Sequence, residues 1–208
     1  ASDVYKRQGV KSFNYHGVQS FEMLALTMSG QHQMENAALA ITTAQLYLGE
    51  LSEVLVREAL VAAKWAGRFE QFGESIILDG AHNSEGTAAL LATLQRLYPN
   101  KRYRFIYAAM ADKDHAVSIG MMDAVATHIT FTQLPIPTAM PAQQLAQIST
   151  HSACRYDENW QNAVKEEIAT AADGELVIIT GSLYFIGEVR NFLARQGGKR
   201  DDSFISTL

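Results

Sequence analysis

The stretch from Ser75 to Gly86 reads SIILDGAHNSEG, and its order of residue types decides the fold class. Its first part, Ser75–Leu78, is rich in branched apolar side chains and predicts a short buried strand. A polar loop over residues 79–85 follows at once, and apolar spacing predicts a helix over residues 86–98. A strand, a loop and a helix in this order make half of a βαβ unit.

The same alternation continues from this stretch to the C-terminus. Apolar runs predict strands, and three- to four-residue apolar spacing predicts helices between them. The strands are expected at 103–108, 129–132 and 175–180, and the helices at 115–124, 142–148, 159–172 and 183–196. Strands that alternate with helices predict a Rossmann-like, mostly parallel, doubly wound α/β sheet.

The residues before this region have a different pattern. Short strand-like patches between Gly9 and Met28 predict a β-hairpin, an Ala-rich helix is expected over 33–48, and Ser52 is expected to cap a second helix that ends near Lys64. We therefore expect five regions: a non-native leader at 1–8, a first region at 9–64, a hinge at 65–70, the α/β domain at 71–197 and a tail at 198–208.

Composition excludes several classes of protein. The chain has 208 residues, 48% of them hydrophobic and 19% charged, with a net charge of −5. These values are typical of a globular protein without a broad basic surface for nucleic acid, and no apolar run is long enough for a membrane span. The one cysteine, Cys154, allows neither an internal disulfide nor a thiolate zinc cage. We expect a monomeric cytoplasmic protein.

Polar residues gather where three predicted strands end. Asp79-Gly80-Ala81-His82-Asn83, Asp112-Lys113-Asp114 and Gly181-Ser182 each follow an apolar run. In open parallel sheets, ligands bind outside the carboxyl ends of the strands. A carboxylate there can bind a ribose, a lysine can neutralise an anion, and a helix N-terminus offers free N–H groups. A simple helix cap is the competing interpretation for Asp79 and for Ser182.

Other charged and aromatic residues have plainer interpretations. Lys165, Glu166 and Glu167 are read as the solvated face of a helix, and Tyr184 and Phe185 as core residues of the last helix. The histidines at 16, 115, 128 and 151 show no metal-ligand spacing. Asn36 lies one turn after His32 in a helix expected to be buried, where an amide needs a partner.

Five ordered motifs together carry a family resemblance. They are His32-Gln33 with Asn36-Ala37-Ala38, Trp65-Ala66-Gly67-Arg68-Phe69-Glu70, Asp79-Gly80-Ala81-His82-Asn83, Asp112-Lys113-Asp114, and Thr180-Gly181-Ser182-Leu183. In order and spacing, over about residues 20–193, the chain resembles the folylpolyglutamate synthases of the Mur ligase superfamily. It departs from them at Ala66 and Ser84, where that family usually has proline. These two changes loosen loops without removing a functional group.

The resemblance implies an ATP-dependent amide ligase. In that family ATP phosphorylates the γ-carboxylate of a folate, and the amine of L-glutamate then attacks the acyl phosphate. The resemblance places Asn36 at adenine, Arg68 at the phosphates, Asp79 at the ribose and His82 beside the phosphate chain. Lys113 and Ser182 would hold the carboxylate of glutamate, with Asp112 and Asp114 orienting that loop. His82, Lys113 and Arg68 are thus the expected catalytic residues.

The phosphate-binding loop of that family is missing from this sequence. No G-x-x-x-x-G-K-[ST] segment occurs, and in that family this loop and the Mg²⁺ ligands lie in an N-terminal ATPase domain. Residues 9–64 would be the end of that domain, and the chain is expected not to catalyse ligation alone. Dihydrofolate synthase activity stays open. The alternatives are a Mur-type peptide ligase of cell-wall synthesis and a non-catalytic α/β binding module.

Overall fold

The computed structural model describes residues 4–7 and 10–197, and the side chains from residue 12 to residue 196. Residues 1–3 and 8 of the expected leader, and the whole expected tail 198–208, lie outside the described residues. The chain divides into two compact units, a first unit that ends at Ala66 and a second unit that begins at Gly67. Each unit is described by itself below.

The first unit is a three-stranded antiparallel sheet with two helices. Its core holds Phe13, Phe21 and Leu24 from the strands and Met34 and Ile41 from the first helix. The hairpin was predicted, whereas the strand β1 was not. The elements are β1 Val4–Arg7, β2 Val10–Tyr15, β3 Phe21–Leu26, α1 Gln31–Leu48 and α2 Glu53–Ala62. One detail was wrong: Ser52 occupies the N-cap position of α2, but its side chain makes no capping hydrogen bond.

The second unit is a six-stranded sheet in the order β4-β5-β9-β6-β7-β8. All its neighbouring strands are parallel except β4, which pairs antiparallel with β5 at one edge. This confirms the predicted mostly parallel α/β sheet. The strands are β4 Glu70–Phe72, β5 Ile76–Leu78, β6 Arg102–Tyr107, β7 Ala126–Phe131, β8 Cys154–Tyr156 and β9 Glu175–Thr180. The helices are α3 Ser84–Leu97, α4 Ala116–Asp123, α5 Ala142–Ile148, α6 Trp160–Thr170 and α7 Leu183–Gly197.

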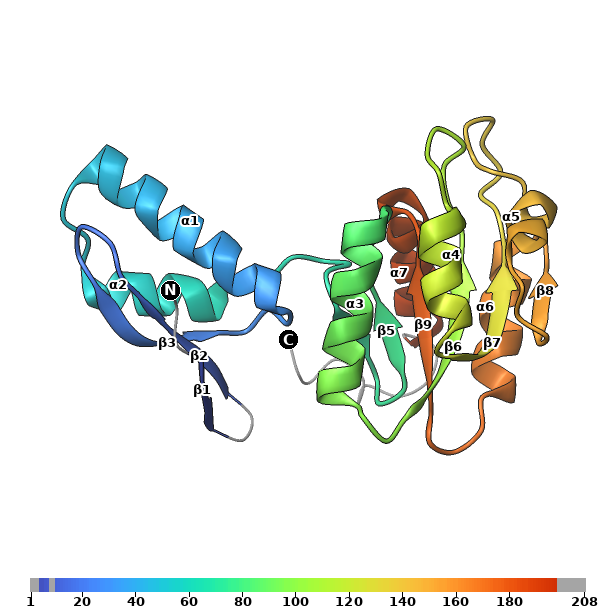
Figure 1. Cartoon of the computed structure of the whole chain (residues 1–208), viewed down its shortest axis with the longest axis horizontal. Helices are drawn as coiled ribbons and strands as arrows, with labels where there is room; N and C mark the ends of the chain where they lie inside the picture. Colours follow the sequence, from blue (N-terminus) through green and yellow to red (C-terminus); the bar gives the residue numbers. More distant parts are fainter. Residues whose placement is uncertain (1–3, 8–9, 198–208) are drawn as a thin grey trace. The chain divides into compact units, whose positions relative to one another are not determined.

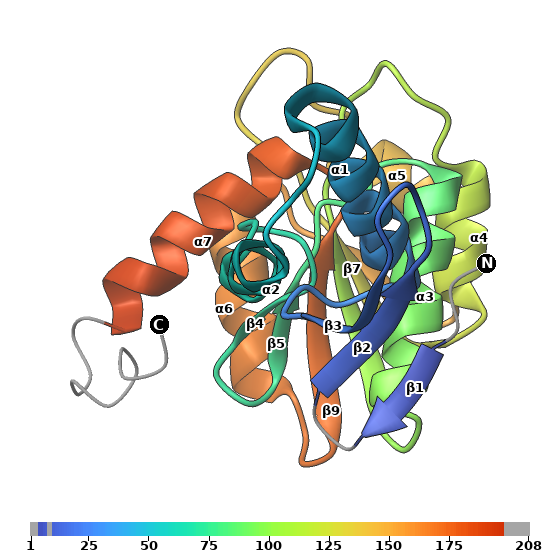
Figure 2. The same cartoon turned by 90° about the vertical axis from the view of Figure 1, so that its left-hand side faces the viewer.

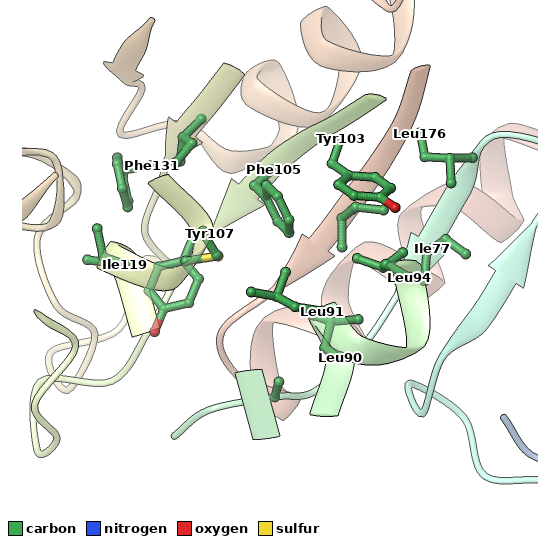
Figure 3. Close-up of a cluster of buried hydrophobic side chains, with 14 of the residues drawn as sticks. Ile77, Leu90, Leu91, Leu94, Tyr103, Phe105, Tyr107, Ile119, Phe131 and Leu176 are labelled. Carbon is green, nitrogen blue, oxygen red and sulfur yellow. The ribbon is translucent and has the colours of Figure 1, made fainter. Parts of the chain in front are cut away.

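The sheet is covered by helices on both faces (Figure 1, Figure 2). Side chains of a strand alternate between the faces, so β9 sends Ile178 to a cluster with α3 and α4, and Ile179 to a cluster with α6 and α7. Figure 3 shows the first cluster, in which Leu90 and Leu94 of α3 lie against Ile77 and Phe105 of the sheet. This double burial explains why β9 is apolar along nearly its whole length.

Several boundaries differ from the predicted ones. Helix α3 begins at Ser84 rather than 86, because the Asn83 side chain accepts the Gly86 N–H at 2.8 Å and caps the helix. The edge strands β4 and β8 were missed, because each has only three residues and, unlike β5, no run of branched apolar side chains. Strand β4 also means that the expected hinge at 65–70 overlaps regular structure at Glu70.

Two side chains predicted from helical patterns lie elsewhere. Glu167 was expected in solvent, but its side chain is 0% exposed and bonds Arg104, Thr130 and Arg155. Tyr184 was expected in the core and is 69% exposed, whereas its neighbour Phe185 is buried as predicted. The partners of Glu167 come from β6, β7 and β8, so no local pattern could have indicated them.

Candidate functional site

The candidate site lies along the carboxyl edge of the second unit's sheet, where β5, β9 and β6 end side by side. Leu78 pairs with Ile179 on β9, and Thr180 pairs with Tyr107 on β6. The loops that follow these three strands therefore leave the sheet at the same edge, the upper edge in Figure 1.

Asp79 follows β5 and holds two backbone segments. One carboxylate oxygen accepts the Phe69 N–H at 2.8 Å, and the other accepts the Ala81 N–H at 2.9 Å. Its side chain is nearly buried, at 9% exposure. The helix-cap interpretation is wrong for Asp79, because Asn83 caps α3. The Asp79 carboxylate instead organises the turn around Arg68 and the loop that carries His82.

His82 is half-buried and has a defined tautomer in its neutral form. Its Nδ1 lies 2.9 Å from the carbonyl oxygen of Gly80. A carbonyl can only accept, so Nδ1 carries the proton and donates it. Nε2 is then free to accept a hydrogen bond, or to donate one when the ring is charged. An imidazole held in this way can serve an anionic ligand.

Gly181 and Ser182 connect β9 to helix α7 and join the Asp79 loop. The Gly181 N–H donates to the Ala81 carbonyl at 3.0 Å, and the Ser182 hydroxyl oxygen accepts the Tyr184 N–H at 3.2 Å. Gly181 has φ +111, and a Cβ there would lie 2.5 Å from the Ala108 carbonyl oxygen. Only glycine fits such a position. Ser182 is 3% exposed and caps α7, as its competing interpretation predicted.

The loop with Asp112, Lys113 and Asp114 follows β6, and all three side chains are exposed. Asp114 accepts the Ala116 N–H at 2.9 Å and so begins helix α4. The loop is tied to the segment after β7, because Ala111 donates to the Thr138 carbonyl at 2.9 Å. No bond among the described residues brings the Lys113 ammonium to Asp79, His82 or Ser182.

His115, for which the sequence indicated no metal-binding role, supports this loop structurally. It is 2% exposed; its Nε2 lies 2.8 Å from the Met110 carbonyl oxygen, and its Nδ1 lies 2.9 Å from the Tyr107 hydroxyl. The carbonyl accepts, so Nε2 donates and Nδ1 accepts from Tyr107. Burial raises the pKa of Tyr107 well above its ordinary value, which keeps this hydroxyl protonated. The only available signal was its place between the loop and α4.

Arg68 lies in the turn before β4, next to the Asp79 loop. The Gly80 N–H donates to the Gly67 carbonyl at 2.7 Å, and the Phe69 N–H is bound by Asp79. Within residues 12–196, no hydrogen bond or ion pair to the Arg68 guanidinium is found. The structure thus brings together Arg68, Asp79, His82 and Ser182 through backbone contacts, leaving the guanidinium open.

Asn36 belongs to the first unit and is exposed, contrary to the buried position expected for it. Its Nδ2 donates to the Gln33 side chain at 3.3 Å, on the same helix face as His32. His32 Nε2 lies 3.0 Å from the Gln33 amide nitrogen, and its Nδ1 is buried without a hydrogen-bond partner. A pocket of about 400 Å³ in this unit is lined by Gln19, Gln45 and Glu50 and holds none of the expected site residues.

Metal and membrane features are limited in the part of the chain that the structure describes. There, no group of three His, Cys, Asp or Glu side chains is arranged to hold a metal ion. None of the helices within residues 4–7 and 10–197 has the length and apolar character that a bilayer crossing requires.

This fold, with its polar loops at the carboxyl edge, defines a class of ligase domain. The chain belongs to the Mur ligase family, because residues 67–183 match the Mur ligase glutamate ligase domain. Within that family its relatives are folylpolyglutamate synthases. It is 33% identical to the dihydrofolate synthase/folylpolyglutamate synthase of Bacillus subtilis, over 83% of this chain and 42% of the relative.

Solved structures support the same placement. A folylpolyglutamate synthase from Thermotoga maritima is 30% identical, with a TM-score of 0.75 over 90% of this chain and 44% of that one. A bifunctional folylpolyglutamate synthase/dihydrofolate synthase with Mn, AMPPNP and L-glutamate bound is 25% identical, with a TM-score of 0.75 over 90% of this chain and 45% of that one. The chain thus spans less than half the length of each relative.

Proposed function

We propose that this chain is part of an ATP-dependent amide ligase that adds L-glutamate to the γ-carboxylate of a folate. The observation that carries the proposal is the Arg68 guanidinium, which has no hydrogen-bond or ionic partner within residues 12–196. It lies on a turn that backbone hydrogen bonds join to the loops of Asp79, His82 and Ser182. It is supported by the glutamate ligase domain match and by the relative that holds AMPPNP and L-glutamate. The proposal includes the monomeric, cytoplasmic state and use of Mg²⁺.

The proposed reaction has two steps. An oxygen of the folate γ-carboxylate attacks the γ-phosphorus of ATP, the bond from that phosphorus to the β,γ-bridging oxygen breaks, and ADP leaves. The amine nitrogen of glutamate then attacks the acyl carbon, an amide bond forms, inorganic phosphate leaves and the ammonium loses a proton.

The nucleotide contacts are assigned to four residues. Arg68 would bind the phosphates, since a planar guanidinium donates two hydrogen bonds to one anion. His82 would donate from Nε2 to the phosphate chain when its ring is charged. Asp79 would accept a hydrogen bond from a ribose hydroxyl, because an acid directly after a strand at the carboxyl edge is well placed for a ribose. Asn36 would contact the adenine with its exposed amide.

The glutamate contacts are assigned to the other two loops. Lys113 would hold a glutamate carboxylate as a point charge, and its exposure leaves the ammonium free to move to that ligand. The Ser182 hydroxyl accepts from the Tyr184 N–H and can still donate its own proton to a carboxylate. Asp112 and Asp114 would orient the Lys113 loop, and for Asp114 the bond to Ala116 supports that role.

The test is a ligation assay on the protein encoded by the longest open reading frame that contains these residues, run beside the 208-residue chain. Folate, ATP and L-glutamate are supplied, and the glutamylated product and ADP are quantified. We expect the longer protein to form both in equal amounts and the 208-residue chain to form neither. Absence of product from every folate would refute the proposal, and dihydropteroate tests the separate dihydrofolate synthase activity. Ligation to a cell-wall nucleotide peptide instead would favour the Mur-type alternative.

A further inference from the structure

The turn that carries Arg68 is held at both of its neighbours by carboxylates. The Gly67 N–H donates to the Glu70 side chain at 2.7 Å, and the Phe69 N–H donates to Asp79 at 2.8 Å. Residues immediately before and after Arg68 are therefore both fixed. Because the backbone is held on both sides of Arg68, the direction in which the Arg68 side chain leaves the turn is defined.

The backbone of this turn is also strained. Phe69 has φ +50, one of only two positive-φ non-glycine residues in the described chain. Such a conformation costs about 1–3 kcal/mol and persists where surrounding contacts impose it. Gly67 has φ +72, and a Cβ there would lie 2.7 Å from the Ile186 side chain. Ile186 belongs to helix α7, so this helix packs against the start of the turn and leaves room only for glycine there.

Glu70 has a second partner far away in the sequence. Its other carboxylate oxygen accepts from Nε of Arg190 on α7 at 2.8 Å, across 120 residues of sequence. One carboxylate therefore joins a main-chain amide beside Arg68 to a guanidinium on α7. The two donors face different oxygens of Glu70, so an isosteric amide would turn its NH₂ group toward one of them and lose that hydrogen bond.

We propose that Glu70 and Arg190 form a positioning pair that aligns Arg68 for the phosphate chain of a nucleoside triphosphate. This inference rests on the proposed phosphate contact of Arg68. Arg190 orients Glu70, Glu70 holds the Gly67 amide, and Asp79 holds the Phe69 amide. The guanidinium then meets the phosphates without first having to order its own turn, and an ordered donor binds an anion more tightly.

The first measurement is amide hydrogen exchange in the 208-residue chain at Gly67 and Phe69. We expect Glu70→Gln and Arg190→Ala to speed exchange at Gly67 about tenfold, the effect of losing one hydrogen bond to a charged group. Arg190→Lys, which keeps the charge, should restore most of the protection. Glu166→Gln is the matched control, since Glu166 also pairs with a partly exposed arginine, Arg155, away from the turn. Unchanged exchange at Gly67 in Glu70→Gln would overturn the inference.

The second measurement separates the positioning pair from the proposed function. In the ligase from the longest open reading frame, Glu70→Gln and Arg190→Ala should raise KM for ATP about tenfold while kcat stays within about threefold, and Arg190→Lys should stay near wild type. Arg68→Ala should raise KM for ATP more than either. An unchanged KM in Arg68→Ala would refute its phosphate role and the inference with it. A raised KM in Arg68→Ala with a normal KM in Glu70→Gln would refute the positioning pair alone.

Discussion

Two charged regions of the same sheet differ in how far their charges are paired. On the face of α6 that packs against the sheet, Glu167 lies between Arg104 and Arg155, and each of its carboxylate oxygens accepts a hydrogen bond from the protein. At the carboxyl edge, Arg68 and Lys113 have no ionic partner among the described residues. Charges that satisfy one another stabilise a fold, whereas charges held open by backbone contacts are available to a ligand. The comparison separates structural charge from functional charge.

The buried network should give the largest effect. Glu167→Ala removes the buried carboxylate that Arg104 and Arg155 share, leaving Arg104 with Glu175 and Arg155 with the exposed Glu166. Loss of one partner of a buried pair costs about 3–5 kcal/mol. The free energy of unfolding, measured by urea denaturation, should fall by that amount. Glu166→Ala is the matched control, since its side chain is 55% exposed in its pair with Arg155, and it should lose no more than about 1 kcal/mol. Equal losses of unfolding free energy in Glu167→Ala and Glu166→Ala would contradict the distinction between the buried and the exposed charges.

The open charges should show the opposite pattern. Alanine at His82 or Lys113 in the proposed ligase should lower turnover about 10- to 100-fold, the effect of losing a charge-assisted hydrogen bond of about 1.5–3 kcal/mol. The free energy of unfolding should change by no more than about 1 kcal/mol, because each side chain makes at most one hydrogen bond in the fold. Steady-state rates and urea denaturation check both expectations. A normal rate in either variant removes that residue from the site.

Acid should weaken the network in two stages. Burial lowers the pKa of His128 from 6.5, although the nearby charge of Glu167 opposes this shift. The Nε2 atom of His128 lies 3.3 Å from Oε1 of Glu167, but the two atoms do not form a hydrogen bond. Burial by itself raises the pKa of Glu167, but hydrogen bonds from Thr130 and Arg104 outweigh it and lower that pKa below 4.5. A lowered folded-state pKa makes the unfolded chain bind more protons, so stability is lost as pH falls.

The free energy of unfolding should first fall below about pH 6.5, the unfolded-state pKa of His128. It should fall again below about pH 4.5, the unfolded-state pKa of Glu167. Urea denaturation at a series of pH values measures both. His128→Gln should remove the first stage and keep the second, whereas His16→Gln, in the exposed turn after β2, should keep both. If the free energy of unfolding still falls near pH 6.5 in His128→Gln, another titrating group causes that fall.

The comparison also explains what the sequence could and could not reveal. Strands β5 and β9 and the second half of β6 are apolar runs, and the loops with Asp79, Ser182 and Lys113 follow them, so both the sheet and the position of these loops at its carboxyl edge were predictable. Glu167 was misread because Arg104 lies 63 residues away and Arg155 12 residues away. Arg190 was overlooked for the same reason, since Glu70 lies 120 residues from it. Pairings across strands leave no period in the sequence.

The smallest effect is expected at Tyr184, where a helical pattern misled the prediction. Phe185, Ile186 and Val189 define the buried face of α7, and Tyr184 lies one residue before that face, with 69% of its surface exposed. Tyr184→Ser should therefore change the free energy of unfolding by less than about 0.5 kcal/mol, since its backbone N–H still donates to Ser182. Urea denaturation measures this change. A loss above about 1 kcal/mol would mean that the ring packs in solution, and that this end of α7 is less open than the rest of the carboxyl edge.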